Sequence, residues 1–235
     1  MKKTNLILCI LFLLIKGIQM DAAQFPTKLE LETLMREKKI PGLSMAIIEN
    51  SEIVLHSELG VKNSQTKDLI DKDTLFEAAS LSKPVFAYGV LKLVEKGQLN
   101  LDKPLVEYLA HSDIKNDERV NCITARMVLT HTSGFPNWRP KNESLKIHFQ
   151  PGERFSYSGE GFLYLQKVIE QISGLSLEDY IKKNVFTPLE MNHSTFVWVN
   201  DNRKAEGHNP GNFSKTHGAS DLKPPLRCGL KSDAP

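Results

Sequence analysis

The sequence of 235 residues has only three cysteines and no excess of either charge, with 30 Lys and Arg against 28 Asp and Glu. Its seven histidines never take the HExxH spacing of a zinc site, and no cysteine has another cysteine within four positions. We therefore expect no metal and no cofactor. Because the charges balance, there is no basic surplus of the kind that favours nucleic acid, and we expect no nucleic-acid partner.

No apolar run is long enough to cross a bilayer as a permanent helix. Residues 6–15 are ten uninterrupted apolar residues behind a basic start, which is the layout of a secretory signal peptide. We expect a signal peptide over residues 1–23, cleaved near Ala22 or Ala23, and export to the periplasm or out of the cell. If it is not cleaved, this segment would anchor the chain to a membrane.

The end of the chain lacks the apolar side chains that a core needs. Residues 201–235 contain only four large apolar residues, and prolines recur there without a period. We expect this segment to form an irregular or disordered tail. It includes Cys228, 106 positions after Cys122, and the two cysteines could equally form a disulfide or remain free thiols.

The hydrophobic periodicity predicts strands near the amino end and helices in the middle. The expected strands are 43–49 and 52–59, joined by a turn at Asn50 and Ser51. The expected helices run over 27–39, from Ser80 to a stop at Gly97, from after Thr124 to Gly134, over 160–173, and from Ser176 to before Pro188. This order, without an internal repeat, predicts an α+β domain over residues 24–200.

Ser80 stands three residues before Lys83, at the start of an expected apolar helix. Positions three apart share a face of a helix, so the lysine amine can reach the serine hydroxyl. A serine needs a neighbouring base to attack a carbonyl carbon. A lysine can be that base only where burial or positive charge lowers its pKa.

A structural explanation of this pair is also open, in which the serine merely caps the helix and the lysine faces solvent. The spacing is not specific by itself, because it also occurs in polar loops, at Ser64 with Lys67 and at Ser112 with Lys115.

Tyr157 precedes two small residues, Ser158 and Gly159, just before another expected helix. Its ring would therefore project from a tight turn. A phenol beside a lysine ammonium can have a lowered pKa and can pass a proton between a nucleophile and a leaving group. Taken alone, the tyrosine is better explained by half-buried packing.

Four segments in order resemble the serine beta-lactamase-related family: FEAASLSKPVFAY, LTHTSGFPNW, PGERFSYSGEGF and VFTPLEMNHS. That family includes class C beta-lactamases, D-alanyl-D-alanine carboxypeptidases, D-aminopeptidases and related esterases. The resemblance implies a beta-lactamase/transpeptidase-like fold, with an antiparallel sheet flanked by helices and a mostly helical subdomain. It also implies that Ser80 is the acylated nucleophile, Lys83 its base or proton partner, and Tyr157 the tyrosine of the second motif.

In the same resemblance, the LTHTSG stretch is regarded as structural. It implies that Thr130, His131, Thr132 and Ser133 hold a helix end, and it gives His131 no catalytic task.

The sequence departs from the family pattern at two places. Gly159 stands where the second motif commonly has asparagine, which makes efficient hydrolysis of beta-lactams doubtful. Members also carry a third motif, lysine or histidine with a glycine two places on, on a later strand. Lys215, Thr216, His217 and Gly218 imitate it with one residue too many, in a stretch without a strand pattern, so we interpret them as a coincidence.

The resemblance fades near residue 215, and we expect a shortened product that lacks the later strands of the sheet. The function that the resemblance implies is an exported serine hydrolase that forms an acyl-enzyme with an amide or ester. Its substrate would be a beta-lactam, a D-amino-acid or cell-wall-like peptide, or an ester. The alternative is a catalytically impaired relative that acts as a binding or regulatory protein or has no activity.

Overall fold

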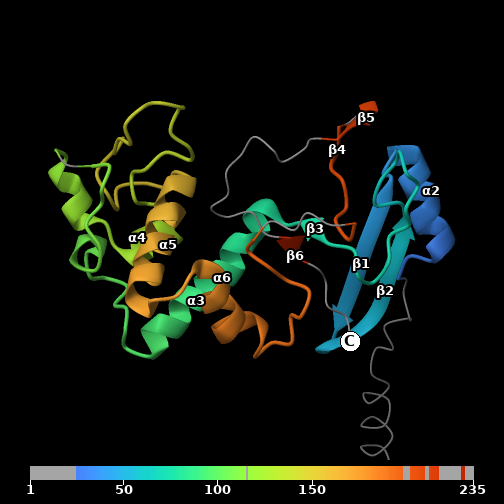
Figure 1. Ribbon diagram of the computed structural model, residues 1–235, viewed down its shortest axis with the longest axis horizontal. Helices are drawn as coiled ribbons and strands as arrows, with labels where there is room; N and C mark the ends of the chain where they lie inside the picture. The colour runs from blue at the N-terminus through green and yellow to red at the C-terminus, as the bar shows by residue number, and fades with distance from the viewer. Residues whose placement is uncertain (1–24, 115, 198–201, 210–211, 217–228, 231–235) are drawn as a thin grey trace, which may run out of the picture.

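The computed structural model describes residues 25–114, 116–197, 202–209, 212–216 and 229–230. The expected signal peptide and Cys228 lie outside the described residues. Figure 1 shows a helical part built from α3 to α6 and a smaller part in which α2 lies against the hairpin of β1 and β2. Among the described residues, no helix combines the length and the apolar character that a membrane span requires.

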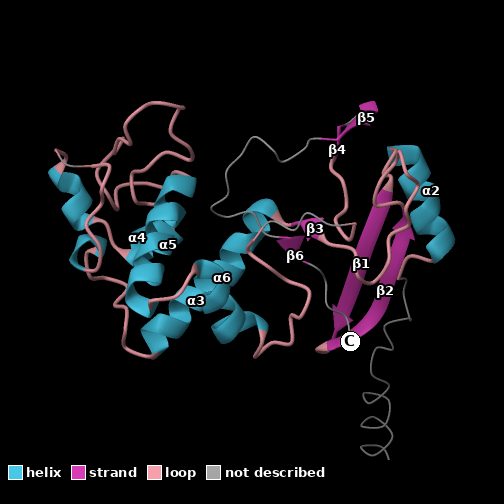
Figure 2. Cartoon of the chain, viewed as in Figure 1, coloured by secondary structure: helices cyan, strands magenta, loops and turns pink. Residues whose placement is uncertain are grey.

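The order of elements confirms an α+β arrangement, with the long strands at the amino end and the helices in the middle (Figure 2). The helices are α2 (Lys28–Lys38), α3 (Ser82–Glu95), α4 (Ala125–Leu129), α5 (Gly159–Ser173) and α6 (Leu177–Ile181), which continues as a π-helical turn, Lys182–Phe186. Short 3₁₀ turns occur at Ala79–Leu81, Leu105–Glu107 and Glu118–Cys122. The strands are β1 (Gly42–Glu49), β2 (Glu52–Gly60), β3 (Phe76–Glu77), β4 (His208–Asn209), β5 (Asn212–Thr216) and β6 (Gly229–Leu230).

The predicted hairpin is confirmed. Strands β1 and β2 pair antiparallel from Gly42 opposite Gly60 to Glu49 opposite Glu52. Asn50 and Ser51 form the turn, and both have positive φ, which matches the twist of a two-residue hairpin turn. The helix α2 covers one face of the hairpin through a small apolar cluster that consists of Leu31, Met35, Leu43, Met45 and Leu59.

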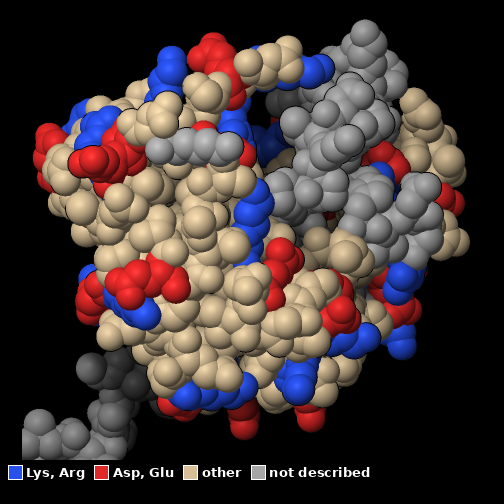
Figure 3. Space-filling view, turned by 60° about the vertical axis from the view of Figure 1, so that its left-hand side comes forward, with Lys and Arg blue, Asp and Glu red and all other residues tan. Residues whose placement is uncertain are grey.

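The main core lies in the helical part and packs α3 against α5 and α6. Phe86, Val90 and Leu93 of α3 are almost completely buried, and the ring of Phe86 contacts that of Phe162 with centroids 5.7 Å apart. This apolar face of α3 orients the helix, and the 3₁₀ turn that leads into it carries the candidate nucleophile. The face in Figure 3 carries interspersed acidic and basic side chains, as the balanced composition predicts.

The structure corrects two expectations about secondary structure. The helix after Thr124 ends at Leu129 rather than near Gly134, because His131 has the left-handed φ of 57° that ends a helical path. The expectation that no strand surrounds Lys215 was also wrong, because Lys215 and Thr216 lie in β5, which pairs antiparallel with β4. Whether such a segment forms a strand depends more on pairing with a neighbouring strand than on its own apolar pattern. His217 and Gly218 lie outside the described residues.

We predict that Leu93→Ala lowers the free energy of unfolding by about 2–5 kcal/mol, because it leaves a cavity in the core around α3. The matched control is Leu91→Ala on the same helix, whose side chain is exposed and whose loss should change stability by no more than about 0.5 kcal/mol. Urea denaturation of both variants measures the difference. Equal destabilisation by the two changes would contradict the assigned orientation of α3.

Candidate active site

Ser80 lies in the 3₁₀ turn that leads into α3, one residue after a strained backbone position. Ala79 has a φ of 44°, a left-handed conformation that costs a residue with a Cβ atom about 1–2 kcal/mol. Two hydrogen bonds hold the turn: the Ser82 hydroxyl donates to the Ala79 carbonyl (2.6 Å), and the Leu81 N–H donates to the Ala78 carbonyl (2.9 Å). Strain that is held by its surroundings in this way is typical of functional sites.

Lys83, in the first turn of α3, points back at Ser80. Its ammonium donates a hydrogen bond to the Ser80 hydroxyl oxygen at 3.1 Å, although the lysine side chain is almost completely buried. Two aromatic rings face the same ammonium, with Nζ 4.9 Å from the ring centroid of Tyr157 and 5.5 Å from that of Phe162. Such rings attract a buried cation through their negative faces.

The phenol of Tyr157 completes the cluster. Burial raises the pKa of Tyr157, but hydrogen bonds with the side chains of Lys83 and Ser80, together with the charge of Lys83, outweigh burial and hold the pKa below its ordinary value of 10.0. The side chain is still 38% exposed, so a substrate can reach it. The structure therefore brings the three predicted site residues together, in an arrangement suited to moving a proton to and from a serine oxygen.

The alternative serine and lysine pairs lie elsewhere. Ser64 and Lys67 are in the turn after β2, beside the end of α2. The Ser112 hydroxyl donates to the neighbouring Asp113 carboxylate at 2.9 Å, and Lys115 lies outside the described residues.

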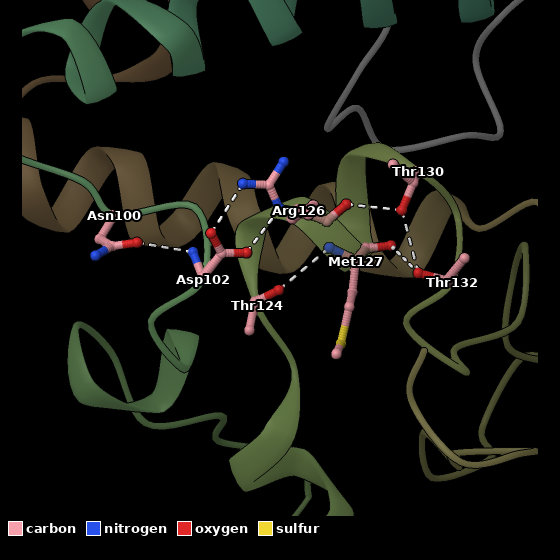
Figure 4. A network of polar contacts seen from close by, with 7 residues as sticks. All are labelled: Asn100, Asp102, Thr124, Arg126, Met127, Thr130 and Thr132. Carbon is pink, nitrogen blue, oxygen red and sulfur yellow. Dashed lines mark hydrogen bonds and ion pairs between the residues drawn. The ribbon is translucent and has the colours of Figure 1, made fainter. Parts of the chain in front are cut away.

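The helix α4 is tied to the chain before it by the polar contacts in Figure 4. At its start, the Thr124 hydroxyl accepts the N–H of Met127 at 3.3 Å. Arg126 forms a two-bonded ion pair with Asp102 (2.6 and 2.8 Å), and Asn100 accepts the N–H of Asp102 (2.9 Å). This network holds α4 against the chain that precedes it.

The end of α4 is held by the threonines of the LTHTSG stretch, as the resemblance implies. The Thr130 hydroxyl donates to the carbonyl of Arg126 at 2.8 Å, and the N–H of Thr132 donates to the carbonyl of Met127 at 2.7 Å. The two threonine hydroxyls also contact each other at 3.1 Å (Figure 4). His131, between them, is turned out of the helix toward Tyr157.

The sequence interpretation missed the contacts that His131 makes with the site. Its ring stacks on that of Tyr157, with centroids 4.3 Å apart, and its Nδ1 accepts the N–H of Ser158 at 3.0 Å. Burial and the charge of Lys83 lower the pKa of His131. The only signal in the sequence was the position of a histidine inside LTHTSG, which by itself says nothing about a segment 26 residues away.

Gly159, where the family commonly has asparagine, has no room for a side chain. A Cβ atom there would lie 2.7 Å from the backbone oxygen of Asn137 and 2.7–2.8 Å from the indole ring of Trp138. The Gly159 N–H also hydrogen-bonds with the side-chain oxygen of Asn137 at 3.2 Å. In this chain, Asn137 and Trp138 therefore occupy the space next to the second motif that an asparagine side chain would need.

The family model described as Beta-lactamase matches residues 29–234, and the chain belongs to the beta-lactamase family. Other members of this family are serine hydrolases. The match extends past residue 215, beyond the four segments that carry the resemblance in sequence.

Curated relatives are longer than this chain. Penicillin-binding protein 4* of Bacillus subtilis (strain 168) is 32% identical over 184 residues, which are 69% of this chain and 39% of that protein. Protein flp of Staphylococcus aureus (strain MW2) is 28% identical over 183 residues, which are 71% of this chain and 37% of that protein. The chain thus spans less than two-fifths of the length of these relatives.

Solved structures confirm the beta-lactamase/transpeptidase-like α+β fold. The octameric penicillin-binding protein homologue from Pyrococcus abyssi has a TM-score of 0.67 and 30% identity, and the likeness covers 79% of this chain and 48% of that one. A class C beta-lactamase in complex with cefoxitin has a TM-score of 0.65 and 25% identity, over 79% of this chain and 55% of that one.

We predict that Gly159→Asn lowers the free energy of unfolding by about 1–3 kcal/mol, because its Cβ atom would overlap Asn137 and Trp138. The matched control is Gly207→Asn, at a glycine whose Cβ position meets no atom within 4 Å. Thermal or urea unfolding of both variants measures the difference. If Gly159→Asn is as stable as the control, the packing assigned to Trp138 is wrong.

Proposed function

We propose that this chain is an exported serine hydrolase that cleaves an amide or ester through an acyl-enzyme on Ser80. The observation that carries the proposal is the contact between the buried Lys83 ammonium and the Ser80 hydroxyl at 3.1 Å, with the ring of Tyr157 4.9 Å from the same ammonium. A serine that merely caps a helix does not require a buried ammonium and a phenol at its oxygen. Membership of the beta-lactamase family supports the same reaction class.

In acylation, the deprotonated phenol of Tyr157 takes the hydroxyl proton while Ser80 Oγ bonds to the substrate carbonyl carbon. The carbonyl electron pair moves onto oxygen and gives a tetrahedral intermediate, next to the amino end of α3, where the helix dipole favours negative charge. The bond to the leaving group then breaks, and the proton on Tyr157 passes to the leaving nitrogen or oxygen. The Lys83 ammonium stabilises the phenolate and the serine oxygen.

In deacylation, water attacks the ester carbon of the acyl-enzyme and gives its proton to Tyr157. When the second tetrahedral intermediate collapses, Ser80 Oγ leaves and takes that proton back, which restores the starting state. Each of the two stages thus uses the same phenol as base and then as acid.

The substrate class that we propose is a D-amino-acid or cell-wall-like peptide or an ester, with beta-lactams as poorer substrates. Gly159 supports this order, because it supplies no amide to hold the substrate at the place where the family commonly has asparagine. The proposed site of action is the periplasm or the outside of the cell, supported by the signal-like residues 1–23.

We predict that a fluorescent fluorophosphonate or penicillin labels the protein on Ser80, and that Ser80→Ala abolishes the label. The matched control is Ser64→Ala, which removes a serine with the same spacing to a lysine and should leave labelling unchanged. Labelling on a gel and peptide mapping provide the readout. Folded wild-type protein that takes no label would instead support the binding or regulatory alternative.

We predict that the rate of labelling rises with pH as Tyr157 loses its proton, through an apparent pKa below 10.0, because Lys83 and Ser80 lower the pKa of this phenol. Tyr157→Phe should reduce the rate by about 10²–10⁴-fold, as expected for loss of a general base. Tyr88→Phe, which changes an exposed tyrosine of α3, is the control and should keep the wild-type profile. An unchanged profile in Tyr157→Phe would rule out the phenol as the base.

A further inference from the structure

His131 is hydrogen-bonded to the backbone on both sides of Tyr157. Its backbone carbonyl accepts the N–H of Ser156 at 2.8 Å, and its side-chain Nδ1 accepts the N–H of Ser158 at 3.0 Å. The amides on both sides of Tyr157 are therefore bonded to His131. The imidazole also stacks on the phenol ring, with centroids 4.3 Å apart and an interplanar angle of 28°.

The other side of the imidazole is packed as well. The Phe162 ring stacks on it with centroids 5.1 Å apart, and the Phe155 ring meets it edge-on at 5.7 Å. Since Phe162 also faces the Lys83 ammonium, the histidine, the tyrosine and the lysine share one packed cluster. A shift of the imidazole would move the phenol relative to Ser80.

The hydrogen bond to Ser158 fixes the charge state of His131. A backbone N–H can only donate, so Nδ1 must be unprotonated to accept it, and the imidazole is neutral with its proton on Nε2. The charged and titratable groups that face the ring are Lys83 and Tyr157; the remaining rings against it, Phe155 and Phe162, carry no charge. Burial and the Lys83 charge lower the pKa of His131, which favours the same neutral form.

We propose that His131 is a positioning residue that holds Tyr157 against Ser80 and Lys83, and that a proton on its Nδ1 releases this hold and switches the site off in acid. Protonation removes the acceptor of the Ser158 N–H and adds a second cation next to Lys83. Both changes favour movement of the imidazole away from the cluster, and the phenol, stacked on it, moves too. This inference rests on the proposed function, in which Tyr157 is the proton acceptor.

The first test measures how the rate of fluorophosphonate labelling depends on pH. The informative quantity is the slope of the acid limb of this profile. Where only Tyr157 must lose a proton, the logarithm of the rate falls with a slope of about one per pH unit. Below the pKa of His131, which lies under its ordinary value of 6.5, a second proton is inhibitory and the slope becomes about two.

Two variants separate the hydrogen bond that His131 makes with Ser158 from the packing of its ring against Tyr157. His131→Asn keeps an acceptor near the Ser158 N–H and tolerates the left-handed backbone, but it cannot take a proton, so its slope should stay at about one throughout. His131→Phe keeps a ring against Tyr157 but has no acceptor, and its rate should be about 10–10²-fold lower at every pH, as expected for a misplaced catalytic group. The substitution should lower the maximal rate of labelling. It should leave unchanged the probe concentration that gives half of the maximal rate.

The matched control is His111→Asn. His111 has comparable contacts outside the site, since its Nδ1 accepts the N–H of Asp113 at 3.3 Å and its ring contacts that of Tyr164 at a tilt, with centroids 4.4 Å apart. This variant should keep the slope of about two in acid. A slope of two that persists in His131→Asn, or a wild-type rate in His131→Phe, would overturn the proposal.

A second measurement does not depend on hydrolysis. Ultraviolet difference titration of the protein against its Tyr157→Phe variant reports the pKa of the Tyr157 phenol. This pKa should move up toward 10.0 when His131→Phe releases the phenol from Lys83. If wild-type protein takes no label, the proposed function fails, and the titration still decides whether His131 positions Tyr157: an unchanged phenol pKa in His131→Phe refutes it.

Discussion

The buried ammonium of Lys83 is the interaction on which the rest of the site depends. A buried cation is costly unless hydrogen bonds and opposing charge compensate it. Here the Ser80 hydroxyl and the aromatic rings of Tyr157 and Phe162 surround it. The same contacts that make its burial tolerable lower the pKa of Tyr157 and keep the phenol close to the serine. Stability of the core and reactivity of the site are therefore coupled through one side chain.

Three segments that are distant in sequence must keep their relative positions for this arrangement to exist. The apolar face of α3 fixes Ser80 and Lys83, because Phe86 and Val90 lie in the core. The hydrogen bonds of the threonines hold the end of α4, from which His131 reaches the residues just before α5. The start of α5 is fixed in turn by Ser158, whose hydroxyl accepts the N–H of Gly161 at 2.9 Å. Each junction is a helix end with its backbone groups satisfied.

Much of the fold could be predicted because its signals are local. The hairpin turn at Asn50 and Ser51 and the span of α5 each follow from signals within a short stretch of sequence, and both are confirmed. The early end of α4 and the strand at Lys215 were not predictable in this way. The left-handed backbone conformation of His131 is imposed by the residues around it in space, and β5 depends on pairing with β4.

For the site, the sequence by itself determined the three reactive groups and the spacing that puts Ser80 and Lys83 on one turn, since helical geometry relates residues three apart. It also determined membership of a family through motifs in a fixed order. Only the tertiary structure decided that Tyr157 meets this pair, that His131 binds the amides on both sides of that tyrosine, and that Trp138 closes the space at Gly159. These contacts join segments that local sequence does not relate, because they are produced by the packing of whole helices and loops against one another.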